Sequence, residues 1–133
     1  IKLIVRGICC LRPGRQGLSE NIQVRSIVGD YLEHSRIFYF HNDGDPLVYS
    51  GSADVMVRSF DRRLESLFLI KDPFLKQQAI NILVFNLMDN VNAYDMLEDG
   101  TYEVRDNDNP TFNIHKEFFN VTKETVQAAK LFG

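Results

Sequence analysis

The sequence predicts an α+β or α/β fold in which a mixed sheet is flanked by helices. Strand-like segments fill most of the first 70 residues, and the clearest helical periodicity follows them. The composition supports this class, because 44% of the 133 residues are apolar and ten are Phe. That many apolar side chains can fill a core, which excludes a disordered or collagen-like chain. We therefore expect residues 1–133 to form a single domain.

The expected strands carry the β-branched, aromatic and other apolar residues that favour extended structure. Two of them flank Asn42-Asp43-Gly44-Asp45-Pro46, residue types typical of a tight turn, and this arrangement predicts a hairpin. We expect one sheet from the five strands at residues 1–5, 22–28, 36–40, 47–49 and 64–70.

Residues 72–89 have the signals of one amphipathic helix. Asp72 is a favourable N-cap, and Pro73 suits the first helical position. Apolar residues then recur at helical spacing, which predicts that one face of the helix packs against the sheet. The residues of that face are Leu75, Ala79, Ile82 and Phe85.

The chain from about residue 90 to residue 133 is patterned less clearly. Residues 90–100 favour a turn and a short helix, and residues 102–105 a short strand. The polar run at 106–110 favours an exposed loop, and residues 122–131 suit a terminal helix.

Charge and cysteine content limit the classes of function. The 15 Lys and Arg against 18 Asp and Glu give a net charge of −3, whereas a general nucleic-acid binder is normally basic. No apolar run reaches the roughly 18 residues of a membrane-spanning helix. Cys9 and Cys10 are adjacent and have no other partner, so we expect reduced thiols in a cytoplasmic protein. Since the chain starts at Ile1 and has no signal peptide, we expect it to be a piece of a longer protein.

The residues best suited to chemistry are His34 and Arg36, with Arg6 as a further cation directly after the first strand. Residues two apart at a strand start point to the same face, which would place an imidazole beside a permanent cation. Such a pair can exchange a proton and hold a phosphate. The alternative is a half-buried histidine beside a solvated arginine on an edge strand.

Other polar clusters favour structural explanations. His41 lies in a turn, and His115 suits a surface or packing position. The histidines and cysteines have no zinc-ligand spacing, so no metal site is expected among these residues. The acidic stretches at 43–45 and 106–109 lack the ligand pattern of the calcium-binding loop, which is about twelve residues long and closes with a Glu, and turn chemistry accounts for them.

His34-x-Arg36 and Gly51-Ser52-x-Asp54 are variants of the His-x-Lys and Gly-Ser-x-Asn signatures of the phospholipase D superfamily. Together with residues 4–14, 19–22, 31–37 and 61–65, they make the chain resemble the C-terminal domain of the long-chain polyphosphate kinases. That family contains two phospholipase-D-like domains. The resemblance is close from residue 1 to about 87 and weak from 90 to 133.

The resemblance implies an ATP:polyphosphate phosphotransferase, in which the terminal phosphate of ATP moves reversibly to inorganic polyphosphate through a phosphohistidine. The histidine that accepts the phosphate lies in the preceding domain, outside this sequence. The resemblance places Arg6 and His34 at the ATP site, across the cleft between the two domains, with His34 as the second, acid–base histidine. Further candidates for phosphate contacts are Arg36, Arg58, Arg62 and Arg63.

The resemblance also implies magnesium as cofactor, with ligands outside this chain. Its partners would be ATP, ADP, inorganic polyphosphate and the preceding domains, with no nucleic acid. We further expect a homo-oligomer in the bacterial cytoplasm, with peripheral membrane association as a further expectation for the full-length enzyme.

Some residues depart from the family pattern or allow a second interpretation. Val55-Met56-Val57-Arg58-Ser59 stands where the family has Trp-Met-Pro-Arg-Asn, although the arginine is kept. Arg62 and Arg63 either line a polyphosphate path or pair with nearby acids, Asp61 or Glu65.

Two other functions compete with the kinase. One is a phospholipase-D-type phosphodiesterase half-domain, against which Arg36 and Asp54 count because they replace Lys and Asn. The other is a non-catalytic oligomerisation module, whose support is a Phe-rich tail containing Phe112, Phe118, Phe119 and Phe132.

Overall fold

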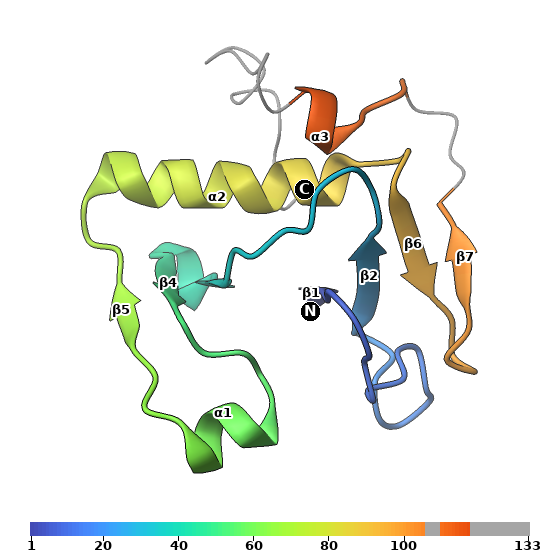
Figure 1. The fold of residues 1–133 in the computed structure, drawn as a ribbon, viewed down its shortest axis with the longest axis horizontal. Helices are drawn as coiled ribbons and strands as arrows, with labels where there is room; N and C mark the ends of the chain where they lie inside the picture. The colour runs from blue at the N-terminus through green and yellow to red at the C-terminus, as the bar shows by residue number, and fades with distance from the viewer. Residues whose placement is uncertain (106–109, 118–133) are drawn as a thin grey trace. The chain divides into compact units, whose positions relative to one another are not determined.

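The computed structural model describes residues 1–105 and 110–117, and these fall into two compact units. The first unit combines residues 1–33 with the described residues from 84 onward, and the second comprises residues 34–83. Helix α2 (Pro73–Met88) contributes residues to both (Figure 1). Each unit has its own sheet, and each is described by itself below.

The first unit contains a mixed four-stranded sheet in the order β1-β2-β6-β7 (Figure 1). Strands β1 (Lys2–Ile4) and β2 (Gln23–Ile27) are parallel. Strand β6 (Ala93–Met96) pairs antiparallel with both β2 and β7 (Tyr102–Val104). The core of this unit contains the buried apolar residues Val24, Val84, Phe85, Ala93, Met96 and Ile114.

Two arginines connect this sheet to the end of α2. Arg25 lies opposite Asp95 in the β2–β6 register, and its Nε and Nη2 donate to the two carboxylate oxygens at 2.7 and 3.0 Å. Arg25 Nη1 and Arg105 Nη1 both donate to the carbonyl of Leu87, at 2.7 and 2.6 Å. Guanidinium groups therefore satisfy the carbonyl end of the helix and complement its dipole.

The chain after α2 is organised by Asp89, whose side chain is fully buried. Its carboxylate accepts hydrogen bonds from the backbone N–H groups of Val91, Asn92 and Ile114 and from the Asn92 amide. The short helix α3 (Ile114–Glu117) begins at one of these donors. A single buried carboxylate thus joins the end of α2, the turn into β6 and α3.

The second unit contains a three-stranded antiparallel sheet in the order β3-β4-β5. Strands β3 (Ile37–Phe40) and β4 (Leu47–Gly51) form the hairpin predicted from the turn sequence, with the short helix η1 (Asn42–Gly44) between them. Helix α1 (Val57–Arg62) and strand β5 (Leu67–Leu69) follow. Lys76 of α2 donates to the carbonyl of Pro46, which holds the start of the long helix to the hairpin.

The α+β class with mixed sheet and helices is confirmed, and most strands lie where the sequence predicts them. The expectation of one sheet is wrong, because β1 and β2 pair with each other while β3, β4 and β5 form a separate sheet. The expectation of a helix within 90–100 is also wrong, because residues 93–96 are β6. An acidic residue is tolerated in this strand because Arg25 of β2 pairs with the Asp95 carboxylate across the sheet.

The long helix is confirmed, including its cap: Leu75 N–H donates to Asp72 Oδ1 at 2.9 Å. Ala79 and Phe85 are buried as predicted, but Leu75 is 56% exposed, so the first turn of the predicted apolar face is not covered. Helix α1 was not predicted, and the terminal helix expected at 122–131 lies outside the described residues.

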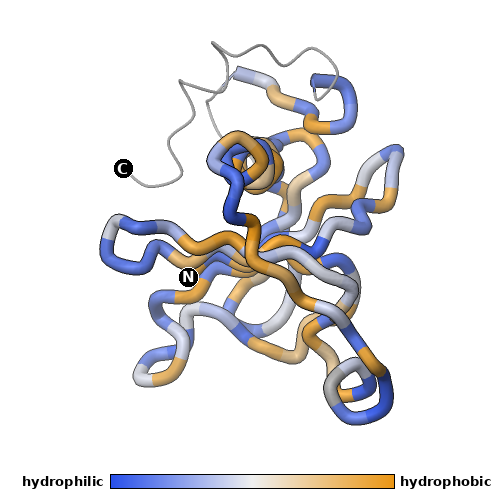
Figure 2. The backbone as a smooth tube through the Cα atoms, turned by 90° about the vertical axis from the view of Figure 1, so that its left-hand side faces the viewer, coloured by the Kyte–Doolittle hydropathy of each residue, from blue (hydrophilic) through white to orange (hydrophobic). Residues whose placement is uncertain are grey.

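None of the helices in residues 1–105 and 110–117 is long and apolar enough to cross a membrane. The longest, α2, carries both hydrophobic and hydrophilic residues (Figure 2).

Replacing Asp89 by Ala should destabilise the protein by at least about 3 kcal/mol, because it leaves several buried N–H donors without an acceptor. Urea unfolding followed by circular dichroism measures this. The exposed Glu98→Ala is the matched control and should cost less than about 0.5 kcal/mol. Equal stability of the two variants would contradict the proposed role of Asp89.

Candidate functional site

The second unit brings together His34, Arg36 and Asp54. The Arg36 guanidinium donates from Nε to Asp54 Oδ1 at 2.7 Å, and from Nη1 to His34 Nδ1 and to the His34 carbonyl, both at 3.2 Å. The juxtaposition of His34 and Arg36 predicted from the sequence is therefore present. His34 lies in the exposed segment before β3 rather than in the strand, and Arg36 immediately precedes β3.

Neighbouring hydrogen bonds fix the backbone that carries this cluster. Ser50 Oγ of β4 donates to the Arg36 carbonyl at 3.0 Å. Ser52 donates to Glu65 Oε2 and accepts from the Ser66 N–H, while its own N–H donates to the Ser66 carbonyl. The Gly51-Ser52-x-Asp54 motif is thus braced against the segment that enters β5, and Asp54 is held where it meets Arg36.

Position 51 of this motif requires glycine for a steric reason. A Cβ atom on Gly51 would overlap the Ser66 carbonyl oxygen and crowd Leu67 Cα, both of them backbone atoms that cannot move aside easily.

Electrostatics fix the charge of Arg36. The hydrogen bond with Asp54 raises the pKa of Arg36 further, and Glu65 adds to this effect. The Arg36 side chain is 21% exposed and that of Asp54 is 25% exposed, so the ion pair is only partly open to water. Arg36 is consequently a fully charged group whose guanidinium is already engaged by the protein.

Arg6 belongs to the first unit and is exposed after β1. Its Nη1 donates to the carbonyl of Glu33 at 2.9 Å. His34 is exposed in the second unit, so the expectation that both side chains are accessible is confirmed. The expectation that they face a common cleft stays a prediction.

The remaining predicted cations lie on or beside α1. Arg58, Arg62 and Arg63 are exposed, and their side chains form no ion pair with any residue in 1–105 or 110–117. The alternative pairing of Arg62 or Arg63 with Glu65 is absent from this part of the chain, where Glu65 accepts from Ser52 instead.

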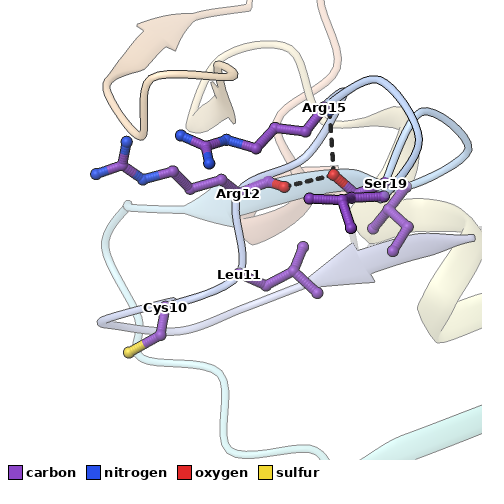
Figure 3. Close-up of a pocket in the computed structure, with 7 residues that line it drawn as sticks. Cys10, Leu11, Arg12, Arg15 and Ser19 are labelled. Atoms are coloured by element: carbon purple, nitrogen blue, oxygen red, sulfur yellow. Dashed lines mark hydrogen bonds between the residues drawn. The ribbon is translucent and has the colours of Figure 1, made fainter.

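The first unit also has a small pocket that the sequence did not indicate, with a volume of about 400 Å³. The side chains of Arg12 and Arg15 extend from the loop that lines it (Figure 3). The buried Ser19 braces this loop by donating to the Arg12 carbonyl and accepting from the Arg15 N–H (Figure 3). Hydrogen bonds from Thr101 lower the pKa of Asp99, and the nearby Arg12 adds to this effect. The only sequence signal was two arginines within a Pro- and Gly-containing loop.

The other candidates of the sequence are structural or solvent-facing. His115 is buried and packs edge-on against the Tyr31 ring, and its Nδ1 accepts from the Tyr31 N–H at 3.4 Å. It is a packing histidine, whereas His41 is exposed. Cys9 and Cys10 are free thiols, as expected.

The second unit therefore presents an exposed histidine in contact with a permanent cation, and it also contains the exposed Arg58, Arg62 and Arg63. Imidazole and guanidinium groups of this kind suit the binding and transfer of phosphoryl groups, where charge neutralisation and positioning dominate. The fold and cluster therefore define a domain suited to phosphate chemistry.

The comparisons with known proteins identify the family. The family model described as polyphosphate kinase C-terminal domain 2 matches residues 1–115, so the chain belongs to that family. Polyphosphate kinase 1 of Chlorobaculum tepidum is 47% identical over 133 residues, covering all of this chain and 19% of the relative. Polyphosphate kinase of Synechocystis sp. is 54% identical over 105 residues, or 79% of this chain and 14% of the relative.

A solved structure agrees with this assignment. The crystal structure of polyphosphate kinase from Porphyromonas gingivalis is similar with a TM-score of 0.87 and 37% identity, over 95% of this chain and 19% of that chain. The resemblance read from the sequence is thereby confirmed. The chain spans about a fifth of the length of the Chlorobaculum tepidum and Porphyromonas gingivalis proteins.

Replacing Gly51 by Ala should lower the free energy of unfolding by about 1–3 kcal/mol, because the added methyl group meets backbone atoms. Thermal denaturation measures this. Ser66→Ala is the control: it removes the exposed hydroxyl of Ser66 but keeps the backbone carbonyl that Gly51 approaches. This variant should therefore have nearly the melting temperature of the wild type. A Gly51→Ala variant as stable as this control would show that β4 and the segment entering β5 are not in close contact.

Proposed function

We propose that this chain supplies part of the ATP and phosphate site of an ATP:polyphosphate phosphotransferase. The observation that carries the proposal is the Arg36-bound His34, exposed and next to a Gly-Ser-x-Asp loop, in a chain that belongs to the polyphosphate kinase C-terminal family. The relatives bear the name polyphosphate kinase, and ATP and inorganic polyphosphate are the substrates we infer for the full-length protein.

The proposed reaction moves one phosphoryl group twice. The bond between the terminal phosphorus of ATP and its bridging oxygen breaks as a P–N bond forms to a histidine of the preceding domain, releasing ADP. That P–N bond then breaks as a terminal oxygen of polyphosphate attacks the phosphorus, and the chain grows by one unit. Both steps run in reverse when ADP is in excess.

In this scheme the chain's own residues provide charge and a hydrogen-bond donor. Arg6 is permanently charged and neutralises phosphate oxygens in the ground state and the transition state. His34 interacts with the transferring group and matters mainly during transfer. Arg58, Arg62 and Arg63 are further candidates for contacts with the polymer, because they are exposed and carry no ion pair within the described residues.

Magnesium is the cofactor that the family resemblance implies for the full-length protein. Within 1–105 and 110–117, no group of three or more His, Cys, Asp or Glu side chains could hold a metal ion. That its ligands lie in other parts of the full-length protein stays a proposal, and we derive no step through the ion.

We also propose that the full-length protein is a homo-oligomer of the bacterial cytoplasm that associates peripherally with membranes, and that its ligands are phosphates rather than nucleic acid. The net charge of −3 supports the last point. Of the Phe-rich tail cited for an oligomerisation module, Phe112 stacks on Phe85 with centroids 6.0 Å apart, which is a core contact. Phe118, Phe119 and Phe132 lie outside the described residues.

The function is tested by measuring polyphosphate synthesis from ATP with the full-length protein. His34→Ala should lower kcat by about a hundredfold or more with a smaller change in the KM for ATP, and Arg6→Ala should raise that KM as well as lower kcat. Lys71→Gln, an exposed lysine outside the cluster, is the charge-matched control and should behave like the wild type. Wild-type release of choline or nitrophenol from a phosphodiester, without polyphosphate synthesis, would favour the phosphodiesterase instead.

Residues 1–133 alone should form no phosphoenzyme and no polymer, because the histidine assigned as phosphate acceptor lies outside them. Incubation with ATP labelled at its terminal phosphate, followed by gel electrophoresis under alkaline conditions, checks this. Stable labelling of residues 1–133 would overturn the division of roles.

A further inference from the structure

Arg36 was a candidate phosphate contact, but its hydrogen bonds point to a different role. One side of the guanidinium donates to Asp54 at 2.7 Å, and Nη1 donates to both the ring and the carbonyl of His34 at 3.2 Å. The carboxylate of Glu65 is close enough to raise the pKa of Arg36 as well. Asp54 and His34 thus engage Nε and Nη1 of the guanidinium, so a phosphate could use these two nitrogens only by displacing one of its neighbours.

The contact with His34 fixes where the proton of the ring lies. An arginine side chain has only donors and keeps its charge in proteins, so Nη1 must donate and His34 Nδ1 must accept. A neutral imidazole that accepts at Nδ1 carries its proton at Nε2. An imidazolium carries N–H groups at both nitrogens, so the same contact is incompatible with that form.

We propose that Arg36 is a positioning residue that holds His34 as the Nε2–H tautomer, and that Asp54 holds Arg36 in place for this purpose. His34 then acts on a phosphate oxygen by donating a hydrogen bond from Nε2 while it keeps its proton, and this role replaces the acid–base role that the family resemblance implies. This inference rests on the proposed function for its substrate, but the tautomer itself is a property of the folded unit.

His34, Arg36 and Asp54, which come from the two sequence signatures, together fix the orientation of the His34 ring. Arg36 and His34 come from the segment entering β3, and Asp54 comes from the loop after β4, which Ser52 braces against Glu65 and Ser66. Arginine can serve both neighbours because its planar fork offers donors in several directions at fixed geometry. A lysine offers one compact ammonium group and cannot reproduce the same bridge.

The first test is kinetic and uses the full-length protein with ATP. Arg36→Gln and Arg36→Lys should each lower kcat by about ten- to a hundredfold, as expected for losing a group that orients a functional histidine, with little change in the KM for ATP. In a His34→Ala background, adding Arg36→Gln should cause no further loss, because both changes remove the same interaction. Lys71→Gln again serves as the control and should leave both parameters unchanged.

The outcomes separate the two roles of Arg36. A raised KM for ATP and a loss that adds to that of His34→Ala would show a direct phosphate ligand and overturn the proposal. An Arg36→Lys variant with wild-type kcat would overturn it as well. If Arg36→Gln fails to fold, as judged by its melting temperature, the charged Arg36→Lys variant still decides between these results.

The second test does not depend on turnover. In full-length protein labelled with ¹⁵N in its histidine rings, at mildly alkaline pH, His34 should show an unprotonated Nδ1 and a protonated Nε2, assigned by comparison with His34→Gln. The Arg36→Gln and Asp54→Asn variants should lose this single tautomer and show a mixture. A protonated Nδ1 in the wild type would overturn the proposal, whereas a wild type with the expected tautomer but no polyphosphate synthesis would contradict only the proposed function.

Discussion

The ion pair between Arg36 and Asp54 is the interaction on which the candidate site depends. It joins the start of β3 to the loop after β4, and the same guanidinium reaches the ring of His34. Asp54 accepts from Nε of Arg36, while Nη1 of the same guanidinium contacts the imidazole. His34 therefore has a defined orientation although it lies before strand β3. An exposed surface ion pair would contribute little, but this pair is partly shielded and fixed by its neighbours.

The arginines of this chain fall into three groups by their contacts. Arg25 and Arg105 satisfy the carbonyl end of α2, and burial lowers the pKa of Arg105, with Arg25 adding to the effect. Arg36 organises the histidine. By contrast, Arg58 and Arg62 are exposed and form no ion pair among the described residues. Sequence alone could not distinguish these groups, since an arginine's partner is set by tertiary contacts.

Local signals predicted much of the fold, and longer-range pairing was missed. Turn residues predicted the hairpin, and Asp72 with Pro73 predicted the start of α2, because both rest on contacts between near neighbours. The split into two sheets and strand β6 depend on residues about 70 apart, such as Arg25 and Asp95. The motifs likewise located His34, Arg36 and Asp54 in the sequence and predicted the imidazole beside the arginine, but only the structure shows that Asp54 pairs with the same guanidinium.

The role proposed for Arg36 is to orient His34 rather than to bind phosphate. A crystal structure of the full-length protein with a non-hydrolysable ATP analogue tests it most directly. We predict that Arg36 keeps its contacts with Asp54 and His34 Nδ1, and that His34 Nε2 lies within hydrogen-bond distance of a phosphate oxygen, about 2.7–3.2 Å. An Arg36 guanidinium that leaves Asp54 and binds the phosphates itself would contradict the claim.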